Sequence, residues 1–284
     1  MKKFCIIIPV YKESLDCIEK ISLNRLYTVI GKKNYHVYLL KPKELDISEY
    51  KKIYPDLLEL NINDSNYFKN TYTYSQLLIT PNIYKILTDK YLYMYIYQLD
   101  CYLFYDNLEK WCDMRYDYIG APIFSEKCGW NLKTENNKNI PKVGNGGFSL
   151  RRIFVFYHLC SVIYDYIPAS IIESQISEDI FFCDVVPMYY NILQIPDWNI
   201  ATYFSWDMSP DIPYDRYNII NFPMAAHAIG KNIRFYKYYI DEFKNNDIIE
   251  YCENKYKDFF QLYYTDNWRS TIYVNKNNKI DTNY

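Results

Sequence analysis

Two adjacent carboxylates, Glu178 and Asp179, stand in the segment ISEDIFF, directly before apolar residues. A carboxylate held beside a substrate hydroxyl can take its proton as a general base, so this pair is a candidate catalytic site. A structural alternative is that both are first-turn acids favoured by the dipole of a helix. Because successive residues of a helix point about 100° apart, only one of the two can readily face a substrate.

A second polar group, QLD, ends the apolar run YLYMYIY at residues 91–97 and places Gln98 and Asp100 on either side of one residue. Apolar or aromatic side chains on both faces of the run predict a central strand covered by helices on both sides. A carboxylate at the carboxyl end of such a strand can ligate a divalent cation that bridges a diphosphate, or accept a hydrogen bond from a ribose hydroxyl. A lone aspartate is more commonly a cap or a turn residue.

The glycines of the chain are concentrated at one point. Three of the seven, Gly144, Gly146 and Gly147, fall within KVGNGGFSLRR at residues 142–152. Glycine supplies positive φ or lets another group approach the backbone closely. The spacing fits neither of the common phosphate-binding patterns, Gly-x-Gly-x-x-Gly and Gly-x-x-x-x-Gly-Lys-Ser/Thr. The glycines alone favour a turn between two strands.

His227 lies in the small and apolar run AAHAIGK. A single histidine in such a run is more often a satisfied core residue than a ligand. By itself, therefore, this histidine predicts no site.

The composition excludes several classes of function. Lys and Arg number 32 against 34 Asp and Glu, so there is no basic field to attract nucleic acid or anionic lipid. The 8 cysteines form no Cys-x-x-Cys pair and follow no cationic signal peptide, which predicts reduced thiols in a cytoplasmic protein. Apolar runs such as CIIIPV are far shorter than the roughly 20 residues that cross a bilayer, so no transmembrane segment is expected.

Strand-like and helix-like segments alternate along the first half of the chain, which predicts an α/β fold with an open twisted sheet and helices on both faces. A helix capped by Ser14 and ended at Gly31 should follow the first strand. Residues 1–240 are expected to form the main domain, and residues 241–284 a partly helical extension with a polar tail. Strands are expected at 3–11, 35–40, 57–62, 91–97 and 116–122, helices at 71–87 and 153–167, and a polar loop at 125–142.

Six segments, taken in order, resemble the DUF5672-type glycosyltransferase-like family of bacterial and viral sugar gene clusters: IIIPVYKESLDCIEKISLNRL, YQLDCYLF, YDYIGAP, VGNGGFSLRR, SEDIFF and FPMAAHAIGK. More distantly, they resemble the wider GT-A superfamily. The resemblance implies a Rossmann-like GT-A fold. It also implies an inverting enzyme that moves a sugar from a nucleoside diphosphate, expected to be a UDP-sugar, to a hydroxyl acceptor in glycan or polysaccharide biosynthesis.

The resemblance also implies where the donor nucleotide and a metal bind. Gln98 and Asp100 stand where an Asp-x-Asp motif belongs, with an amide in place of its first carboxylate. A divalent cation, Mn²⁺ or Mg²⁺, is therefore expected to be held weakly, by Asp100 and by His227, which matches a late histidine of the superfamily. The end of the first strand, which meets the nucleotide, is matched by Pro9, Val10, Tyr11 and Glu13.

Three further positions match the segment that faces the donor sugar: Asn145, Gly146 and Gly147. There the missing Cβ atoms would let the backbone lie against a hexose, with Asn145 bound to its hydroxyls. Glu178 and Asp179 match the pair that holds the catalytic base, and Asp179 is the expected base.

Two other functions are open at this point. A non-catalytic nucleotide- or sugar-binding module could keep the fold without metal chemistry, and Gln98 supports that alternative. A nucleotidyltransferase would require a glycine-rich, basic loop after the first strand, which PVYKESLD lacks.

Overall fold

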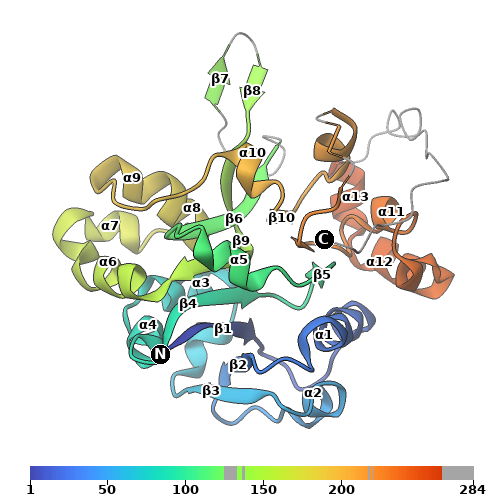
Figure 1. The fold of residues 1–284 in the computed structure, drawn as a ribbon, viewed down its shortest axis with the longest axis horizontal. Coiled ribbons are helices and arrows are strands. Elements are labelled where there is room, and N and C mark those ends of the chain that lie inside the picture. Colours follow the sequence, from blue (N-terminus) through green and yellow to red (C-terminus); the bar gives the residue numbers. More distant parts are fainter. Residues whose placement is uncertain (125–132, 136–137, 217, 220, 264–284) are drawn as a thin grey trace.

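A computed structural model describes residues 1–124, 133–135, 138–216, 218–219 and 221–263 of the chain. In this part, the main sheet has the strand order β3-β2-β1-β4-β9-β6 (Figure 1). The first four of these are parallel, and β9 is antiparallel to both of its neighbours. The strands are β1 (Lys2–Pro9), β2 (His36–Pro42), β3 (Leu58–Ile62), β4 (Tyr91–Tyr97), β6 (Tyr118–Ile123) and β9 (Lys142–Arg152).

The central strand β4 confirms the pattern expected for a strand covered on both faces. Six of its seven residues are buried, and Leu92 is exposed. The buried hydroxyl of Tyr95 donates to the carbonyl of Leu108 at 2.6 Å, and that of Tyr97 donates to the carbonyl of Ser22 at 3.2 Å. Burying these tyrosines is tolerated because each hydroxyl has a partner.

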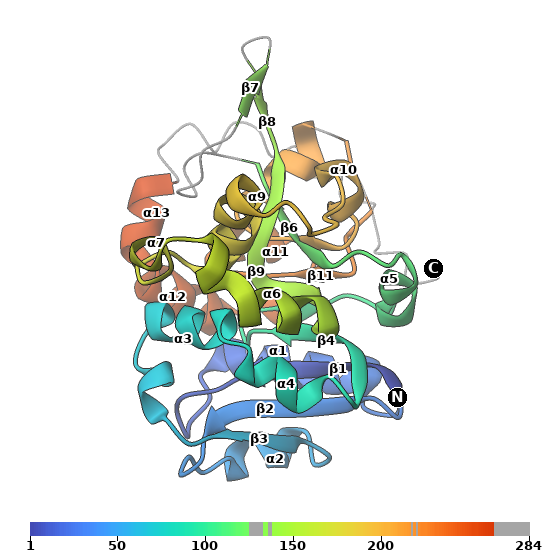
Figure 2. The same ribbon diagram turned by 90° about the vertical axis from the view of Figure 1, so that its left-hand side faces the viewer.

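Helices cover both faces of the sheet, as predicted. The helices α3 (Thr71–Ile79), α4 (Asn82–Leu87) and α6 (Ile153–Tyr166) lie on one face, nearest the viewer in Figure 2. On the other face, α1 (Cys17–Ile30) and α5 (Leu108–Asp113) receive the two tyrosine hydroxyls of β4. Shorter helices are α2 (Ser48–Ile53), α7 (Ala169–Ile172), α8 (Glu178–Ile180), α9 (Val186–Tyr189), α10 (Trp198–Ala201) and α11 (Ile233–Tyr236).

The α1 helix begins two residues later than the sequence predicted. Its cap is Asp16 rather than Ser14, because Oδ1 of Asp16 accepts from the backbone N–H groups of Ile18 at 2.9 Å and Glu19 at 3.0 Å. The Glu19 carboxylate accepts in return from the backbone N–H of Asp16 at 2.8 Å, completing a capping box. The helix ends at Gly31, as expected.

The glycine-rich segment is a strand and not the turn that its glycines favoured. Gly144, Gly146 and Gly147 all lie within β9, which pairs with β4 on one side and β6 on the other. The pairing with β6 shows register shifts next to Ala121. The glycines precede the register with β4, which begins at Phe148, so the pairing with β6 and the hydrogen bond from the Gln98 N–H to the Gly147 carbonyl hold them extended and override the local preference of glycine for turns.

Two small sheets accompany the main one. The strands β5 (Tyr102–Leu103), β10 (Ser205–Trp206) and β11 (Ala225–Ala226) form one of them. The strands β7 (Lys133–Glu135) and β8 (Lys138–Ile140) form a hairpin that projects at the top of Figure 1, within the segment predicted to be a loop. Residues 125–132 of that predicted loop lie outside the described part.

The C-terminal helices α12 (Asn246–Lys255) and α13 (Lys257–Tyr263) pack against a second, aromatic core cluster. Cys252 and Phe260 of these helices are buried in it, together with Phe243 from the short helix Asp241–Lys244. The domain boundary at residue 240 stays a prediction, and the polar tail at 264–284 lies outside the described residues. Among the described helices, none combines the length and the apolar character needed to cross a membrane.

Candidate functional site

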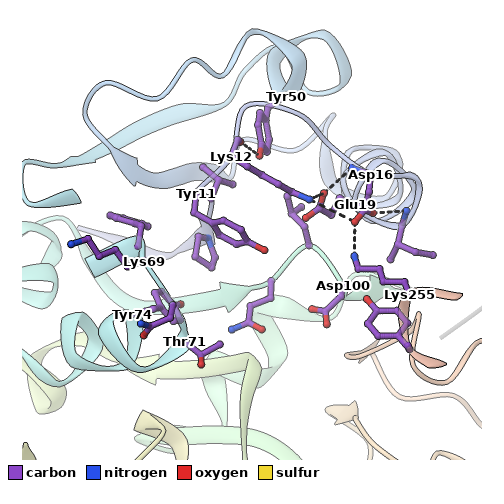
Figure 3. Close-up of a pocket in the computed structure, with 18 residues that line it drawn as sticks. Tyr11, Lys12, Asp16, Glu19, Tyr50, Lys69, Thr71, Tyr74, Asp100 and Lys255 are labelled. Atoms are coloured by element: carbon purple, nitrogen blue, oxygen red, sulfur yellow. Dashed lines mark hydrogen bonds and ion pairs between the residues drawn. The ribbon is translucent and has the colours of Figure 1, made fainter. Parts of the chain in front are cut away.

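A pocket of about 380 Å³ opens where β1 and β4 end (Figure 3). Parallel strands bring their carboxyl ends to one edge of a sheet, which is where open α/β sheets bind ligands. Other lining side chains come from α1, from the segment that leads into α3, and from the end of α12. The predicted nucleotide-binding residues that line the pocket are Pro9, Val10, Tyr11, Gln98 and Asp100.

The other predicted residues lie outside this lining. Glu13 is exposed and does not line the pocket. His227 and Gly147 are hydrogen-bonded to lining residues, and Asp179 is linked to them only through the neighbouring Gly146. The roles predicted for all of these residues stay predictions.

His227 is held between two carboxylates. Its Nε2 lies 3.0 Å from Oδ1 of Asp100 and 3.1 Å from Oε1 of Gln98, and its Nδ1 lies 2.9 Å from Oδ1 of Asp207. Burial by itself would lower the pKa of His227, but Asp100 and Asp207 raise that pKa to about 10. Burial likewise opposes the ionised form of Asp100, yet the His227 charge keeps the pKa of Asp100 below its ordinary value. Without a cation, the edge of the pocket therefore holds an imidazolium between two carboxylates at neutral pH, and a cation that binds Nε2 of His227 would have to displace its proton.

His227 and two neighbouring side chains, Asp100 and Cys101, offer potential metal-ligand atoms that lie within 4.8 Å of one another. Cys101 fits a metal poorly, because burial raises the pKa of its thiol well above the ordinary value and its Sγ lies 3.4 Å from the carbonyl of Gly147. Asp100 and His227 fit better, since a carboxylate behind a metal-binding histidine, here Asp207, is a usual arrangement. With two protein ligands, most of the coordination of a cation would come from substrate and water.

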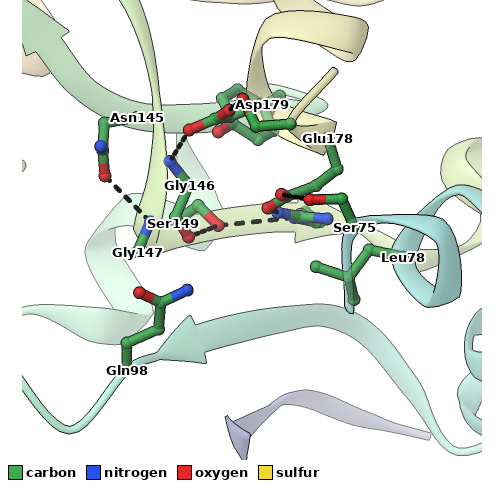
Figure 4. Close-up of polar contacts among 12 residues, drawn as sticks. Ser75, Leu78, Gln98, Asn145, Gly146, Gly147, Ser149, Glu178 and Asp179 are labelled. Atoms are coloured by element: carbon green, nitrogen blue, oxygen red, sulfur yellow. Dashed lines mark hydrogen bonds and ion pairs between the residues drawn. The ribbon is translucent and has the colours of Figure 1, made fainter. Parts of the chain in front are cut away.

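Gly146 and Gly147 of β9 are needed because neighbouring side chains stand too close to the positions that Cβ atoms would take; Gly146 and Glu178 are shown in Figure 4. A Cβ on Gly147 would stand 2.2 Å from Nε2 of His227, and one on Gly146 would stand 2.7 Å from Oε1 of Glu178. The backbone of Gly147 also accepts from the Gln98 N–H at 3.0 Å, and its N–H donates to Oδ1 of Asn145 at 3.0 Å. The glycines thus have a structural reason that is independent of any sugar.

Gly147→Ala is expected to lower the free energy of unfolding by about 1–3 kcal/mol, because the added methyl group overpacks the contact with His227. Removing the imidazole should relieve that clash. The double variant Gly147→Ala/His227→Ala should therefore be more stable than the sum of the two single changes predicts, as measured by urea denaturation. Strict additivity of the two effects would contradict this explanation.

Asp179 is the second residue of α8 and contacts the glycine-rich segment directly. Its Oδ2 accepts from the Gly146 N–H at 3.1 Å, and its Oδ1 accepts from the Ser177 hydroxyl at 2.5 Å and from the Ile180 N–H at 2.8 Å. Burial, followed by the negative charge of Glu178, raises the pKa of Asp179 to about 6. A carboxyl group with a pKa near neutrality is suited to exchanging protons with a substrate.

Glu178 has a different environment from its neighbour. Its Oε1 forms a salt bridge of 2.9 Å with Nη2 of Arg151, and its Oε2 accepts from the Ser75 hydroxyl at 3.1 Å. The Arg151 side chain is completely buried and donates to the Tyr84 hydroxyl at 3.2 Å. Both oxygens of Glu178 are therefore engaged within the protein.

Two important residues of the site were missed by the sequence analysis. Asp207 stands alone in SWDMS, and Arg151 follows the glycines as an ordinary basic residue. Neither has a local signal, since each acts on a residue at least 20 positions away, His227 and Glu178 respectively.

The comparisons with known proteins identify a family and a fold. A family model described as "Protein of unknown function (DUF5672)" matches residues 58–227. No curated protein matches the chain.

Among solved structures, mouse xyloside xylosyltransferase 1 in its apo form has a TM-score of 0.51 and 8% identity, covering 79% of this chain and 97% of that chain. The galactosyltransferase LgtC in complex with donor and acceptor sugar analogs has a TM-score of 0.49 and 8% identity, covering 94% of this chain and 99% of that chain. At such identity, the likeness to the xylosyltransferase shows the fold alone, which is the predicted GT-A fold.

Proposed function

The chain belongs to the DUF5672 family, and we propose that it is a glycosyltransferase that moves a sugar from a nucleoside diphosphate to a hydroxyl acceptor. A UDP-sugar is the first donor to test, and the acceptor is a growing glycan or polysaccharide. The GT-A fold supports the proposal, but a fold by itself assigns no activity, so the argument depends on the site.

One observation carries the proposal: the glycine-rich strand connects the pocket to a carboxyl group with a raised pKa. Gly147 contacts Gln98 and His227 at the edge of the pocket, and Gly146 donates to Asp179. Gln98 and Asp179 lie on opposite sides of this strand segment in Figure 4. Sugar transfer requires this combination, namely a donor site next to a group that can take a proton from the acceptor.

In this proposal, the pocket binds the nucleotide and the glycine-rich strand aligns the donor sugar. Asp179 takes the proton from the acceptor hydroxyl as its oxygen attacks the anomeric carbon. The bond between that carbon and the diphosphate breaks, and the diphosphate leaves with the electron pair. A base opposite the leaving group in a single displacement gives inversion at the anomeric carbon.

A divalent cation held by Asp100 and His227 would offset the charge of the diphosphate. Asp100→Ala is expected to weaken binding of the nucleotide sugar about tenfold to a hundredfold, since it removes one charged ligand. The fold should persist, because Asp207 still accepts from His227. Calorimetry with and without Mn²⁺ should show that chelation weakens binding to the wild type but adds little to the effect of Asp100→Ala.

Unchanged affinity in Asp100→Ala would remove Asp100 from the donor site. Full activity of the wild type in chelator would show that the enzyme uses no metal.

A non-catalytic nucleotide- or sugar-binding module is the second candidate, and the position of Gln98 favours it. The amide oxygen of Gln98 lies 3.1 Å from Nε2 of His227 and brings no negative charge to the site. The decisive experiment incubates the protein with a panel of nucleotide sugars and follows the release of nucleoside diphosphate. Release above the protein-free rate supports the transferase, whereas binding without release at any pH or metal concentration supports the module.

A further inference from the structure

The pocket is completed by a helix from outside the matched segment 58–227. Lys255 and Tyr256, at the end of α12, line the pocket together with residues of β1, of α1 and of the segment that follows β4. The α12 helix is anchored in the aromatic core by Cys252, which is fully buried. A wall of the pocket therefore comes from a firmly packed part of the chain.

Lys255 is fixed at the edge of the pocket by the cap of α1. Its Nζ donates to Oδ2 of Asp16 at 2.7 Å, while Oδ1 of Asp16 caps the helix. The Tyr256 and Tyr251 rings lie 5.3 Å and 5.5 Å from the Lys255 ammonium. Asp16 takes one of the three N–H donors of Lys255 and the Tyr251 and Tyr256 hydroxyls also interact with the ammonium, yet the side chain is still 38% exposed. Lys255 is thus a positioned cation with capacity for a further anionic partner.

Tyr256 connects this cation to the segment that carries His227. A Cβ on Gly230 would stand 2.7 Å from Cε2 of Tyr256, so the ring packs directly on the backbone three residues after His227. Burial raises the pKa of the Tyr256 hydroxyl, the Lys255 charge opposes that rise, and the negative charge of Asp100 adds to it. The end of α12 is therefore held against the edge of the pocket that Asp100 and His227 form.

The charges of the pocket leave a role for such a cation. Its lining contains three lysines, Lys12, Lys69 and Lys255, against three acids, Asp16, Glu19 and Asp100. Lys12 is paired with Glu19 at 2.7 Å. Lys69 lies on the opposite side of the pocket from Asp100, whereas Lys255 lies on the same side (Figure 3).

We propose that Lys255 binds the phosphate groups of the donor nucleotide, so that α12 forms a functional wall of the donor pocket. The proposal rests on the proposed function. Because Gln98 stands in place of a carboxylate, few protein groups can hold a cation beside the diphosphate. Lys255 supplies a positive charge next to Asp100 that partly compensates for this. Lysine is suited to this because its ammonium binds phosphate as a compact point charge.

The test measures the affinities of UDP, GDP, CDP, ADP and TDP, and of the matching nucleosides, by calorimetry with Mn²⁺ present. Lys255→Ala is expected to weaken binding of the preferred nucleoside diphosphate about tenfold to a hundredfold and to leave nucleoside binding unchanged. Lys257→Ala is the matched control, because Lys257 is exposed, two residues further on, and does not line the pocket. It should leave both affinities unchanged.

A purely structural role of Lys255 is distinguished by two further variants. Asp16→Asn keeps a capping side chain but removes the charge that Lys255 pairs with, so it should retain most of the diphosphate affinity. Lys255→Gln removes the charge but keeps most of the apolar stem and a donor for Asp16, and it replaces Lys255→Ala if that variant does not fold.

Three results would overturn the inference. Diphosphate affinity equal to that of the wild type in Lys255→Ala or Lys255→Gln would remove Lys255 from the site and leave the proposed function intact. An equal fall in nucleoside and diphosphate affinity would assign it a structural role. Absence of nucleotide binding by the wild type would overturn the inference and the proposed function together.

Discussion

Asp179→Asn is expected to lower the rate of sugar transfer about a hundredfold to ten-thousandfold, the usual loss when a general base is removed. The affinity for the nucleoside diphosphate should be unchanged, because Asp179 does not line the nucleotide pocket. The Asn side chain retains an oxygen that can accept from the Gly146 N–H, so the connection between β9 and α8 should survive. Rates and affinities are measured separately, by product formation and by calorimetry.

The environment of Asp179 explains why it, and not Glu178, is the proposed base. Its Oδ2 accepts only from Gly146 among the described contacts, which leaves a lone pair for a substrate proton. Both oxygens of Glu178 are engaged, by Arg151 and by Ser75. Glu178→Gln should therefore affect the rate per folded molecule less than Asp179→Asn does.

The raised pKa of Asp179 also predicts a dependence on pH. The rate of transfer should rise as the pH increases through about 6, the pKa of Asp179, because only the ionised carboxylate can take a proton. This acid-side inflection should vanish in Asp179→Asn. Because the folded state binds this proton more tightly than the unfolded chain does, the stability contributed by the protonated form is lost as the pH rises from about 4 to about 6.

Asp184→Asn is the matched control for Asp179→Asn. Asp184 lies five residues further along, is 30% exposed and pairs with Lys142 at 2.5 Å. Its neutralisation should change the transfer rate no more than a few-fold. Near-wild-type transfer by Asp179→Asn would move the base to another residue, and a product that retains the anomeric configuration of the donor would overturn the inverting mechanism.

Arg151→Met should destabilise the protein by about 3–5 kcal/mol, because it leaves the Glu178 carboxylate buried without its charged partner. The Arg151 side chain is completely buried and that of Glu178 is 7% exposed, so solvent cannot replace the lost interaction. The aromatic rings of Tyr118, Phe156 and Phe182 lie 5.7–5.8 Å from the guanidinium, which adds to the loss. Chemical denaturation at pH 7 gives the change in the free energy of unfolding.

Two comparisons test the cause of this loss. Arg152→Met removes the adjacent arginine, which is 45% exposed and pairs with Asp117 at 3.4 Å, and should cost about 1 kcal/mol or less. Adding Glu178→Gln to Arg151→Met should restore part of the stability, because no buried charge then remains unpaired. A loss of similar size in both arginine variants would show that the buried ion pair is not the reason.

Much of the fold could be predicted because strands and helices follow from local patterns. The apolar run in β4 predicted cover on both faces, and six of its seven residues are buried. The acids at 178 and 179 do begin a short helix, α8, as a first-turn preference predicts. The turn that the glycines alone favoured was wrong, because pairing with β6 holds the segment extended, and its expected place beside the donor sugar stays a prediction.

The sequence by itself determined the α/β class, the strands that end at the pocket and the presence of Asp100 and Asp179 as candidate groups, since these depend on periodicity and residue type. Only the tertiary structure decided their partners. Asp207 holds His227, Arg151 holds Glu178, and α12 brings Lys255 to the cap of α1, 239 residues away in the chain. Such partners are set by the path of the whole chain and by the need of each buried charge for a counter-charge, and no local pattern records either.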